Sequence, residues 1–252
     1  MSIIIKSAEE ITAMRQAGRI VGEILEILSR QVRPGMKTKE LDSIAETELE
    51  KRGATSSFKG YHGFPACLCV SVNDEIVHGI PGERVLHEGD IVSLDFGAIY
   101  RGFHGDAAIT VGVGKITPEA EKLIQTTEAT LEAGIAAAQR GATLGDISAA
   151  IQSYAESRGY WVVREYTGHG IGREMHEDPQ IPNFGTPGTG SIIKRGMTLA
   201  LEPMLNIGDW RTRVDDDQWT VRTADGSLSA HFEHTIAITD SQPEVLTNRV
   251  YA

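Results

Sequence analysis

Apolar residues recur at helical spacing in four stretches of the chain, and these stretches form two pairs. The first pair covers residues 8–28 and 39–52, and the second covers residues 118–139 and 144–157. Within each stretch an apolar side chain returns every three or four residues, which is typical of an amphipathic helix with one buried side. The pattern therefore predicts two helix pairs, one in each half of the chain.

Segments rich in β-formers follow each predicted helix pair. They cover residues 67–72, 91–98 and 106–113 in the first half and residues 162–166, 198–205, 219–223 and 228–239 in the second. Helices and strands grouped in this way favour an α+β fold, in which helices cover one side of an antiparallel sheet.

Related segments recur in the two halves at a nearly constant offset. Residues 35–53 resemble residues 141–159 at an offset of 106, and both segments begin and end on glycine. Residues 88–95 resemble residues 195–202 at an offset of 107, and both runs end on a carboxylate. Two matches in the same order indicate an internal duplication.

The repeated helical segments also carry matching boundary signals. Thr38 and Thr143 are expected N-caps, and Gly53 and Gly159 are expected C-terminal stops. No linker rich in Pro, Gly or Ser separates the halves. We therefore expect a single catalytic domain, 1–252, with pseudo-symmetric halves of about 1–113 and 114–252 and a site in the cleft between them.

Composition excludes some classes of protein. With 40% hydrophobic and 23% charged residues the chain is typical of a soluble globular protein. A formal net charge of −11 argues against DNA or an anionic membrane as the main partner. No run approaches the roughly 18 apolar residues of a membrane-spanning helix. The two cysteines, Cys67 and Cys69, are too close for a mutual disulfide, which favours a reducing, cytoplasmic setting.

Carboxylates at strand ends are the first candidates for chemistry. Asp95 ends an apolar run, and Asp106 opens the run that returns after a glycine turn. A hairpin would bring the two carboxylates together, and a proton or a cation would then have to relieve their repulsion. A turn or capping role is the alternative for either residue taken alone.

The second half contains two similar carboxylates and a histidine. Glu202 follows an apolar run, Glu233 lies within another, and His169 stands between two glycines. A lone histidine is often structural. Four carboxylates with one imidazole, however, form an oxygen-rich donor set, and such a set suits Mn, Fe(II) or Co better than an all-thiolate set of the kind found in zinc sites does. Four carboxylates also balance the charge of two divalent ions.

The five residues and the segments around them resemble type I methionine aminopeptidases, which have the creatinase-like pita-bread fold. The matching segments are YHGFP at 61–65, VN at 72–73, VHGIP at 77–81, LDFG at 94–97, GHGIG at 168–172, LEP at 201–203 and FEHT at 232–235. The resemblance covers nearly the whole chain. Glu233 lies only 31 positions after Glu202, in the interval where type II enzymes carry a helical insertion, so the chain resembles type I.

The resemblance implies two divalent metal ions, which could be Co, Mn, Fe or Zn. Asp95 would chelate one ion, His169 and Glu202 would chelate the other, and Asp106 and Glu233 would bridge both. The implied activity is removal of the initiator methionine from nascent proteins with a small second residue, by attack of a water that the two metals activate.

The resemblance also implies roles for further residues. Glu202 would act as the general base, His176 would donate to the developing oxyanion, and His78 would contact the scissile amide. The methionine pocket would be lined by Phe58, Tyr61, Phe64, Cys69, Met175 and Trp219. Phe58 stands where cysteine is frequent in the family, and Met175 stands where an aromatic residue is frequent. Composition alone would make these apolar residues part of the core.

Other residues receive weaker assignments. A monovalent cation is expected near Asn73 and Ser229 from the same resemblance. We expect the remaining histidines to be structural: His62, His87, His104, His231 and His234. The N-terminal methionine of nascent polypeptides is the expected partner, with transient ribosome association, and the chain is expected to be a monomer.

Two alternatives stay open at this point. Prolidases and proline-specific aminopeptidases share the fold and the metal ligands but carry an additional N-terminal domain. Some other relatives keep the fold, lack the ligands and act as binding proteins. Cleavage of Met-Ala-Ser rather than X-Pro peptides would favour the first interpretation.

Overall fold

The computed structural model describes residues 2–248 of the 252-residue chain, and this part contains four α-helices. The helices are α1 (Ala8–Gln31), α2 (Thr38–Lys51), α3 (Pro118–Ala137) and α4 (Leu144–Glu156). Each predicted helix is therefore confirmed, with ends that differ by at most three residues. No helix in residues 2–248 is long and apolar enough to cross a membrane.

One of the two predicted N-caps is wrong. Thr143 is the N-cap of α4, as expected, but the N-cap of α2 is Lys37, and Thr38 is the first helical residue. The hydroxyl of Thr38 accepts the N–H of Gly82 at 2.8 Å and is therefore used by a neighbouring loop. The side chain of Glu40 instead accepts the N–H of Lys37 at 2.7 Å.

The strands form one large sheet and two small ones. They are β1 (Thr55–Ser56), β2 (Leu68–Val72), β3 (Glu75–Val77), β4 (Ile91–Tyr100), β5 (Phe103–Gly112), β6 (Trp161–Val162), β7 (Thr167–Gly170), β8 (Glu177–Pro182), β9 (Thr198–Leu201), β10 (Met204–Asn206), β11 (Thr212–Val214), β12 (Val221–Thr223), β13 (Ser229–His231), β14 (Glu233–Ala237) and β15 (Glu244–Val245). The nine-stranded sheet has the order β1-β4-β5-β14-β9-β7-β8, with β2 paired to β4 and β15 to β14. The small sheets are β13-β10-β6 and β11-β12-β3.

The two predicted strands over 198–205 and 228–239 are each interrupted in the structure. The first breaks at Glu202 and Pro203, and the second breaks at Phe232, so that each segment leaves one sheet and enters another. Proline has no N–H to donate to a ladder, which explains the first break. The N–H of Phe232 donates to the carbonyl of Pro203 at 3.3 Å, so the two breaks lie side by side. Glu202 and Glu233 therefore stand where the chain passes between sheets.

The duplication is visible in the large sheet. The hairpin β4-β5 and the pair β14-β9 lie next to each other, with β5 beside β14 at the centre. An isolated bridge joins Lys37 to Val85 ahead of the first pair, and a matching bridge joins Thr143 to Ile192 ahead of the second. The two halves therefore repeat both the helix start and the strand that carries a carboxylate.

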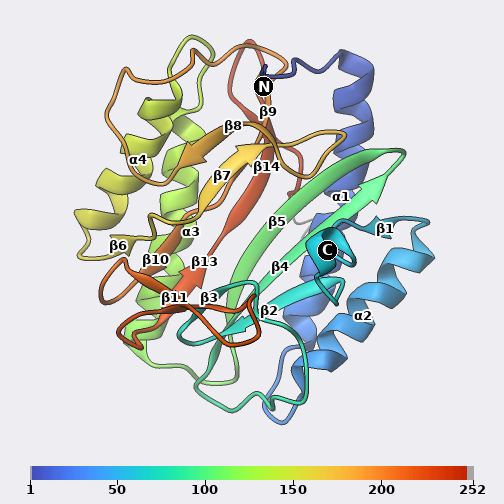
Figure 1. Cartoon of the computed structure of the whole chain (residues 1–252), viewed down its shortest axis with the longest axis vertical. Coiled ribbons are helices and arrows are strands. Elements are labelled where there is room, and N and C mark those ends of the chain that lie inside the picture. The colour runs from blue at the N-terminus through green and yellow to red at the C-terminus, as the bar shows by residue number, and fades with distance from the viewer. Residues whose placement is uncertain (1, 249–252) are drawn as a thin grey trace.

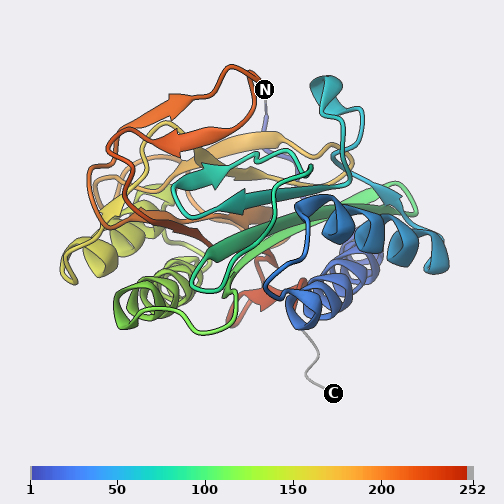
Figure 2. The same cartoon turned by 90° about the horizontal axis from the view of Figure 1, so that it is seen from below.

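Helices cover one side of the large sheet, and the small β11-β12-β3 sheet lies over the other side (Figures 1 and 2). The helix-facing side is apolar: Val92, Leu94 and Phe96 of β4 are fully buried in one core with Ile24 of α1. Since side chains alternate along a strand, Asp95 points to the opposite side. The expected α+β class, with helices on one side of an antiparallel sheet, is confirmed.

Candidate metal centre

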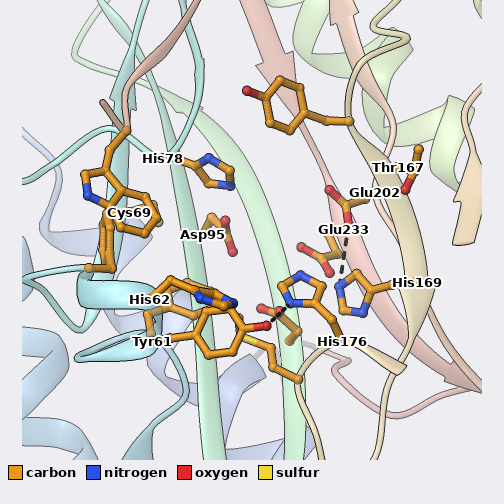
Figure 3. Close-up of a pocket in the computed structure, with 16 residues that line it drawn as sticks. Tyr61, His62, Cys69, His78, Asp95, Thr167, His169, His176, Glu202 and Glu233 are labelled. Atoms are coloured by element: carbon orange, nitrogen blue, oxygen red, sulfur yellow. Dashed lines mark hydrogen bonds and ion pairs between the residues drawn. The ribbon is translucent and has the colours of Figure 1, made fainter. Parts of the chain in front are cut away.

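A cavity of about 330 Å³ opens on the side of the sheet that the helices leave uncovered. It is lined by Phe58, Tyr61, His62, Phe64, Cys69, His78, Asp95, Asp106, Tyr166, Thr167, His169, Met175, His176, Glu202, Trp219 and Glu233. Every catalytic, substrate-binding and metal-ligating candidate from the sequence is in this set. The structure therefore brings together residues from both halves of the chain (Figure 3).

Strand register places three carboxylates in one patch at the base of the cavity. Ala108 of β5 lies opposite Asp95 of β4 on one side and opposite Glu233 of β14 on the other. Asp106 is two residues from Ala108 on the same strand, so it shares the side of the sheet with both. The small side chain of Ala108 leaves the space between the carboxylates open.

His169 and Glu202 complete this patch from the second half of the chain. Nδ1 of His169 lies 2.9 Å from the carbonyl oxygen of Gly170, which can only accept, so Nδ1 carries the proton. Nε2 therefore keeps its lone pair, and it lies 3.6 Å from Oε1 of Glu202. Burial lowers the pKa of His169 to about 3, so the ring is neutral at ordinary pH.

Three carboxylate oxygens in the cavity are buried without a hydrogen-bond donor among the described residues. They are Oδ1 of Asp95, Oδ1 of Asp106 and Oε1 of Glu233. Burial raises the pKa of Asp106 to about 7, and burial together with the neighbouring carboxylates raises the pKa values of Asp95, Glu202 and Glu233. Acids held in this way lack the positive partner that would keep them ionised.

The donor set fits divalent cations. Asp106, His169 and Glu233 each offer a ligand atom, and these atoms lie within 4.8 Å of one another. The orphaned oxygens of Asp95, Asp106 and Glu233 would gain the partners they lack, and the lone pair of His169 Nε2 faces the same space. Carboxylate oxygens with one imidazole suit Mn, Fe(II), Co or Zn.

Two further histidines face the carboxylates across the cavity (Figure 3). Burial lowers the pKa of His78 to about 4 and also lowers the pKa of His176, so both rings are neutral at pH 7. The hydroxyl of Tyr61 lies 2.8 Å from Nδ1 of His176. With the phenol donating to Nδ1, Nε2 of His176 carries the N–H and can donate into the cavity.

Apolar side chains form the rest of the wall. Phe58, Phe64, Cys69 and Met175 are buried in one cluster, against which Trp219 packs. The rings of Phe64 and Trp219 meet edge to face with centroids 5.1 Å apart. Burial raises the pKa of Cys69 well above the ordinary value, so the thiol stays protonated and behaves as a small apolar group. This wall has the chemistry of a pocket for an unbranched, sulfur-containing side chain.

Three lining residues were not among the candidates from the sequence: His62, Tyr166 and Thr167. His62 was expected to be structural, yet it lies in the cavity wall with a positive φ of 47°. The adjacent pocket candidate Tyr61 could have indicated that His62 also lines the cavity, because the turn that contains both residues presents both side chains to it. Tyr166 and Thr167 directly precede the glycine-flanked histidine, which was the corresponding signal for them.

The residues of the expected monovalent-cation site lie together outside this cavity. The carbonyl of Asn73 accepts the N–H of Ser229 at 3.0 Å, and Asn73 has a positive φ of 61°. The side-chain oxygen of Asn73 accepts the N–H of Ile91 at 3.0 Å. The hydrogen bond between Asn73 and Ser229 therefore brings together the two residues that would supply oxygen ligands. The monovalent cation itself stays a prediction.

Residues 12–240 match the model of the family described as Metallopeptidase family M24. The chain belongs to this family. It is 56% identical over 245 residues to a methionine aminopeptidase of Clostridium perfringens, covering 97% of this chain and 98% of that protein. Against methionine aminopeptidase 1 of Bacillus subtilis the identity is 52% over 245 residues, with 97% and 99% covered.

Solved structures give the same picture. The methionine aminopeptidase of Thermotoga maritima superposes with a TM-score of 0.97 at 47% identity, covering 98% of this chain and all of that one. A prolidase from Pyrococcus furiosus shares the fold, with a TM-score of 0.81 at 21% identity, but this chain covers only 66% of it. The resemblance to methionine aminopeptidases, the pita-bread fold and the expectation of a metal-dependent hydrolase are thus confirmed, and the prolidase alternative is less supported.

Proposed function

We propose that this metallopeptidase removes the initiator methionine from nascent proteins whose second residue is small. The observation that carries the proposal is the cavity itself, which combines five metal-ligand candidates at its base with an apolar, sulfur-compatible wall. An apolar pocket beside a cation-binding base suits a free amino terminus that bears a methionine side chain.

Five residues would hold two divalent ions. In this proposal Asp95 would help to hold one ion, His169 and Glu202 would help to hold the other, and Asp106 and Glu233 would contribute to holding both. When bound, such ions lower the pKa of a coordinated water towards neutrality and polarise a carbonyl group. Their charge would also keep the buried carboxylates ionised.

Three side chains of the cavity have separate roles in the proposed hydrolysis. Glu202 acts as the general base and accepts a proton from the attacking water. His176, held by Tyr61, donates from Nε2 to the oxygen that becomes negative as the carbonyl is attacked. His78 is neutral and faces the same space, where it contacts the scissile amide and assists the leaving amine.

The cavity wall sets the specificity. Phe58, Phe64, Cys69 and Met175 enclose an apolar side chain, with the rings of Tyr61 and Trp219 closing the rim. Phe58 and Met175 depart from frequent family residues but keep the wall apolar, so methionine selectivity is retained. The residue after methionine would lie at the crowded rim, which limits it to small side chains.

Several finer features belong to the same proposal. We propose that the chain acts as a monomer of one domain, in the cytoplasm, with transient contact to the ribosome. The two buried cysteines are unpaired thiols, which agrees with a reducing compartment. A monovalent cation near Asn73 and Ser229 is also included.

A peptide panel tests the proposal. The metal-loaded protein should cleave Met-Ala-Ser, should cleave Met-Leu-Ser much more slowly, and should leave Ala-Ala-Ser intact. Hydrolysis of X-Pro peptides alone would instead indicate a prolidase-like enzyme. Failure to cleave any of these peptides after loading with Mn, Fe(II), Co or Zn would contradict both interpretations.

A further inference from the structure

A buried ion pair joins the segment ahead of α1 to a turn in the second half of the chain. Nζ of Lys6 contacts Oε2 of Glu177, and the two side chains are only 3% and 4% exposed. The desolvation of two such charges offsets much of their attraction, so the pair is a weak stabiliser. Its place in the fold indicates a different role, because Glu177 closes the turn that reaches the cavity.

The carboxylate of Glu177 organises this turn from within. Its second oxygen, Oε1, accepts the N–H of Arg173 at 2.9 Å and the N–H of Glu174 at 3.4 Å. The turn is closed further by the N–H of Gly172, which donates to the carbonyl of Glu174 at 3.0 Å. One oxygen of Glu177 thus holds the turn, while the other is held by Lys6.

The turn presents two residues to the cavity. Met175 belongs to the buried apolar cluster of the wall. His176 lies with its ring centroid 4.2 Å from that of His169 and with Nδ1 2.8 Å from the hydroxyl of Tyr61. Any movement of the turn would therefore shift the pocket wall and the proposed oxyanion donor together.

The packing around the pair leaves little freedom. A Cβ at Gly172 would lie 2.5 Å from Cε of Lys6 and 2.5 Å from Oε1 of Glu177, so a larger residue there would have to displace the two paired side chains. The backbone of Lys6 is fixed as well, because its N–H donates to the carbonyl of Gly196 at 2.8 Å. Lys6 is thus held at its backbone by Gly196 and at its ammonium group by Glu177.

We propose that Lys6 and Glu177 form a positioning pair that fixes the turn at residues 172–177 and, through it, Met175 and His176. The pair touches neither substrate nor metal. The inference rests on the proposed function, because Met175 and His176 act there as pocket wall and donor.

The decisive variant is Lys6→Met, which keeps the length of the side chain and removes its charge. The Glu177 carboxylate then loses its counter-ion and turns towards solvent, which releases the amides of Arg173 and Glu174. In the metal-loaded full chain, kcat/KM for Met-Ala-Ser should fall 10- to 100-fold. The preference for Met-Ala-Ser over Leu-Ala-Ser should narrow at least threefold, because the Met175 wall has moved.

A matched control breaks another ion pair of the same region. Arg15 of α1 pairs with Glu244 near the surface, and neither residue lines the cavity. Arg15→Met should leave kcat, KM and the methionine preference within twofold of the parent. Lys6→Arg, which restores the charge, should recover part of the activity that Lys6→Met loses.

Hydrogen exchange gives a readout that does not need activity. Amides of residues 173–177 should exchange at least tenfold faster in Lys6→Met than in the parent and in Arg15→Met. If the parent cleaves no methionine peptide, the proposed function fails, while the exchange rates still decide whether the pair holds the turn. If Lys6→Met does not fold, Glu177→Gln replaces it and should show the same changes to a smaller degree.

Two results would overturn the proposal. One is a variant with the ion pair broken that shows a lower melting temperature but unchanged kcat, KM and methionine preference, as a purely structural pair would give. The other is unchanged exchange at residues 173–177 in both Lys6→Met and Glu177→Gln.

Discussion

Nε2 of His169 lies 3.6 Å from Oε1 of Glu202, and the two side chains come from β7 and from the end of β9. The other ring nitrogen is already used by the carbonyl of Gly170. The unprotonated Nε2 faces the Glu202 carboxyl group at a separation too long for a hydrogen bond between them. This arrangement leaves room for a cation and disfavours a self-neutralising hydrogen bond.

Replacing Glu202 by glutamine should show how much activity depends on the negative charge of this side chain and not on its size. Glu202→Gln keeps the size of the side chain but removes a metal ligand and the proposed base. We expect kcat on Met-Ala-Ser to fall by about 10²- to 10⁴-fold, the usual contribution of a general base. Titration of Mn²⁺ into the chelated protein should also show weaker binding of one equivalent. Glu50→Gln on the exposed side of α2 is the control, and equal activity of both variants would contradict the assignment.

Replacing Tyr61 by phenylalanine should affect turnover more than binding. Tyr61→Phe keeps the ring in the wall but removes the hydroxyl that lies 2.8 Å from Nδ1 of His176. We expect a loss of about fivefold in kcat, which corresponds to ~1 kcal/mol for a neutral hydrogen bond. KM for Met-Ala-Ser should stay within twofold.

The matched control for this variant is Tyr154→Phe on α4, which is remote from the cavity. It should leave both constants unchanged. A rise in KM with unchanged kcat in Tyr61→Phe would show that the hydroxyl serves substrate binding and not the orientation of His176.

Much of the fold follows from periodicity in the sequence. The four helices were predicted because each has a continuous apolar side, and β4 and β5 because each has a long apolar run. Short strands such as β8 and β11 were not predicted. β8 contains Pro179 and Pro182, and β11 has only three residues, none of them buried, so neither shows an alternating pattern. Their pairing depends on neighbours that are distant in the chain.

The site was predicted in a different way. The proximity of Asp95 and Asp106 could be predicted from the expected hairpin alone, because the two residues lie on adjacent strands. The meeting of these residues with His169, Glu202 and Glu233 followed from resemblance, since no local pattern links the two halves. His62 was missed because its role in the wall arises from a positive φ that the sequence does not reveal. The roles of the individual residues stay predictions, as do the bounds of the halves.

Removal of the metal should reverse the pH dependence of stability. In the protein from which a chelator has removed the metal, burial raises the pKa of Asp106 to about 7 from an ordinary value of 3.8. Between about pH 4 and pH 7 the native state therefore holds more protons than the unfolded state, so the free energy of unfolding falls as pH rises. At about 1.4 kcal/mol per pKa unit this carboxyl contributes up to ~4 kcal/mol.

Thermal melts in the presence of a chelator test this. The parent should melt about 5–10 °C lower at pH 8 than at pH 5. Metal-free Asp106→Asn should show a shallower slope than the parent but keep part of it, because burial also raises the pKa values of Asp95, Glu202 and Glu233. The metal-loaded parent should show the opposite trend below about pH 6, because protons compete with the metal for its ligands. Greater stability of the chelated parent at pH 8 than at pH 5 would contradict buried, unpartnered carboxylates.

A methyl group at Gly97 should narrow the methionine pocket. A Cβ there would lie 2.8 Å from Cε1 of Phe58 and 2.8 Å from Cβ of Ser57, so the Phe58 ring has to move. Because Phe58 lines the cavity, we expect Gly97→Ala to raise KM for Met-Ala-Ser about 10-fold. Binding of Mn²⁺ should change less than twofold, since the carboxylates keep their register.

Gly82→Ala provides the matched control. A Cβ at Gly82 would meet only the carbonyl oxygen of Ile80, at 4.0 Å, so the same chemical change causes no displacement there. KM should stay within twofold of the parent in this variant. A wider choice of first residues in Gly97→Ala, for example faster cleavage of Leu-Ala-Ser, would contradict the expectation, because displacement of Phe58 into the cavity can only reduce the space that the first side chain occupies.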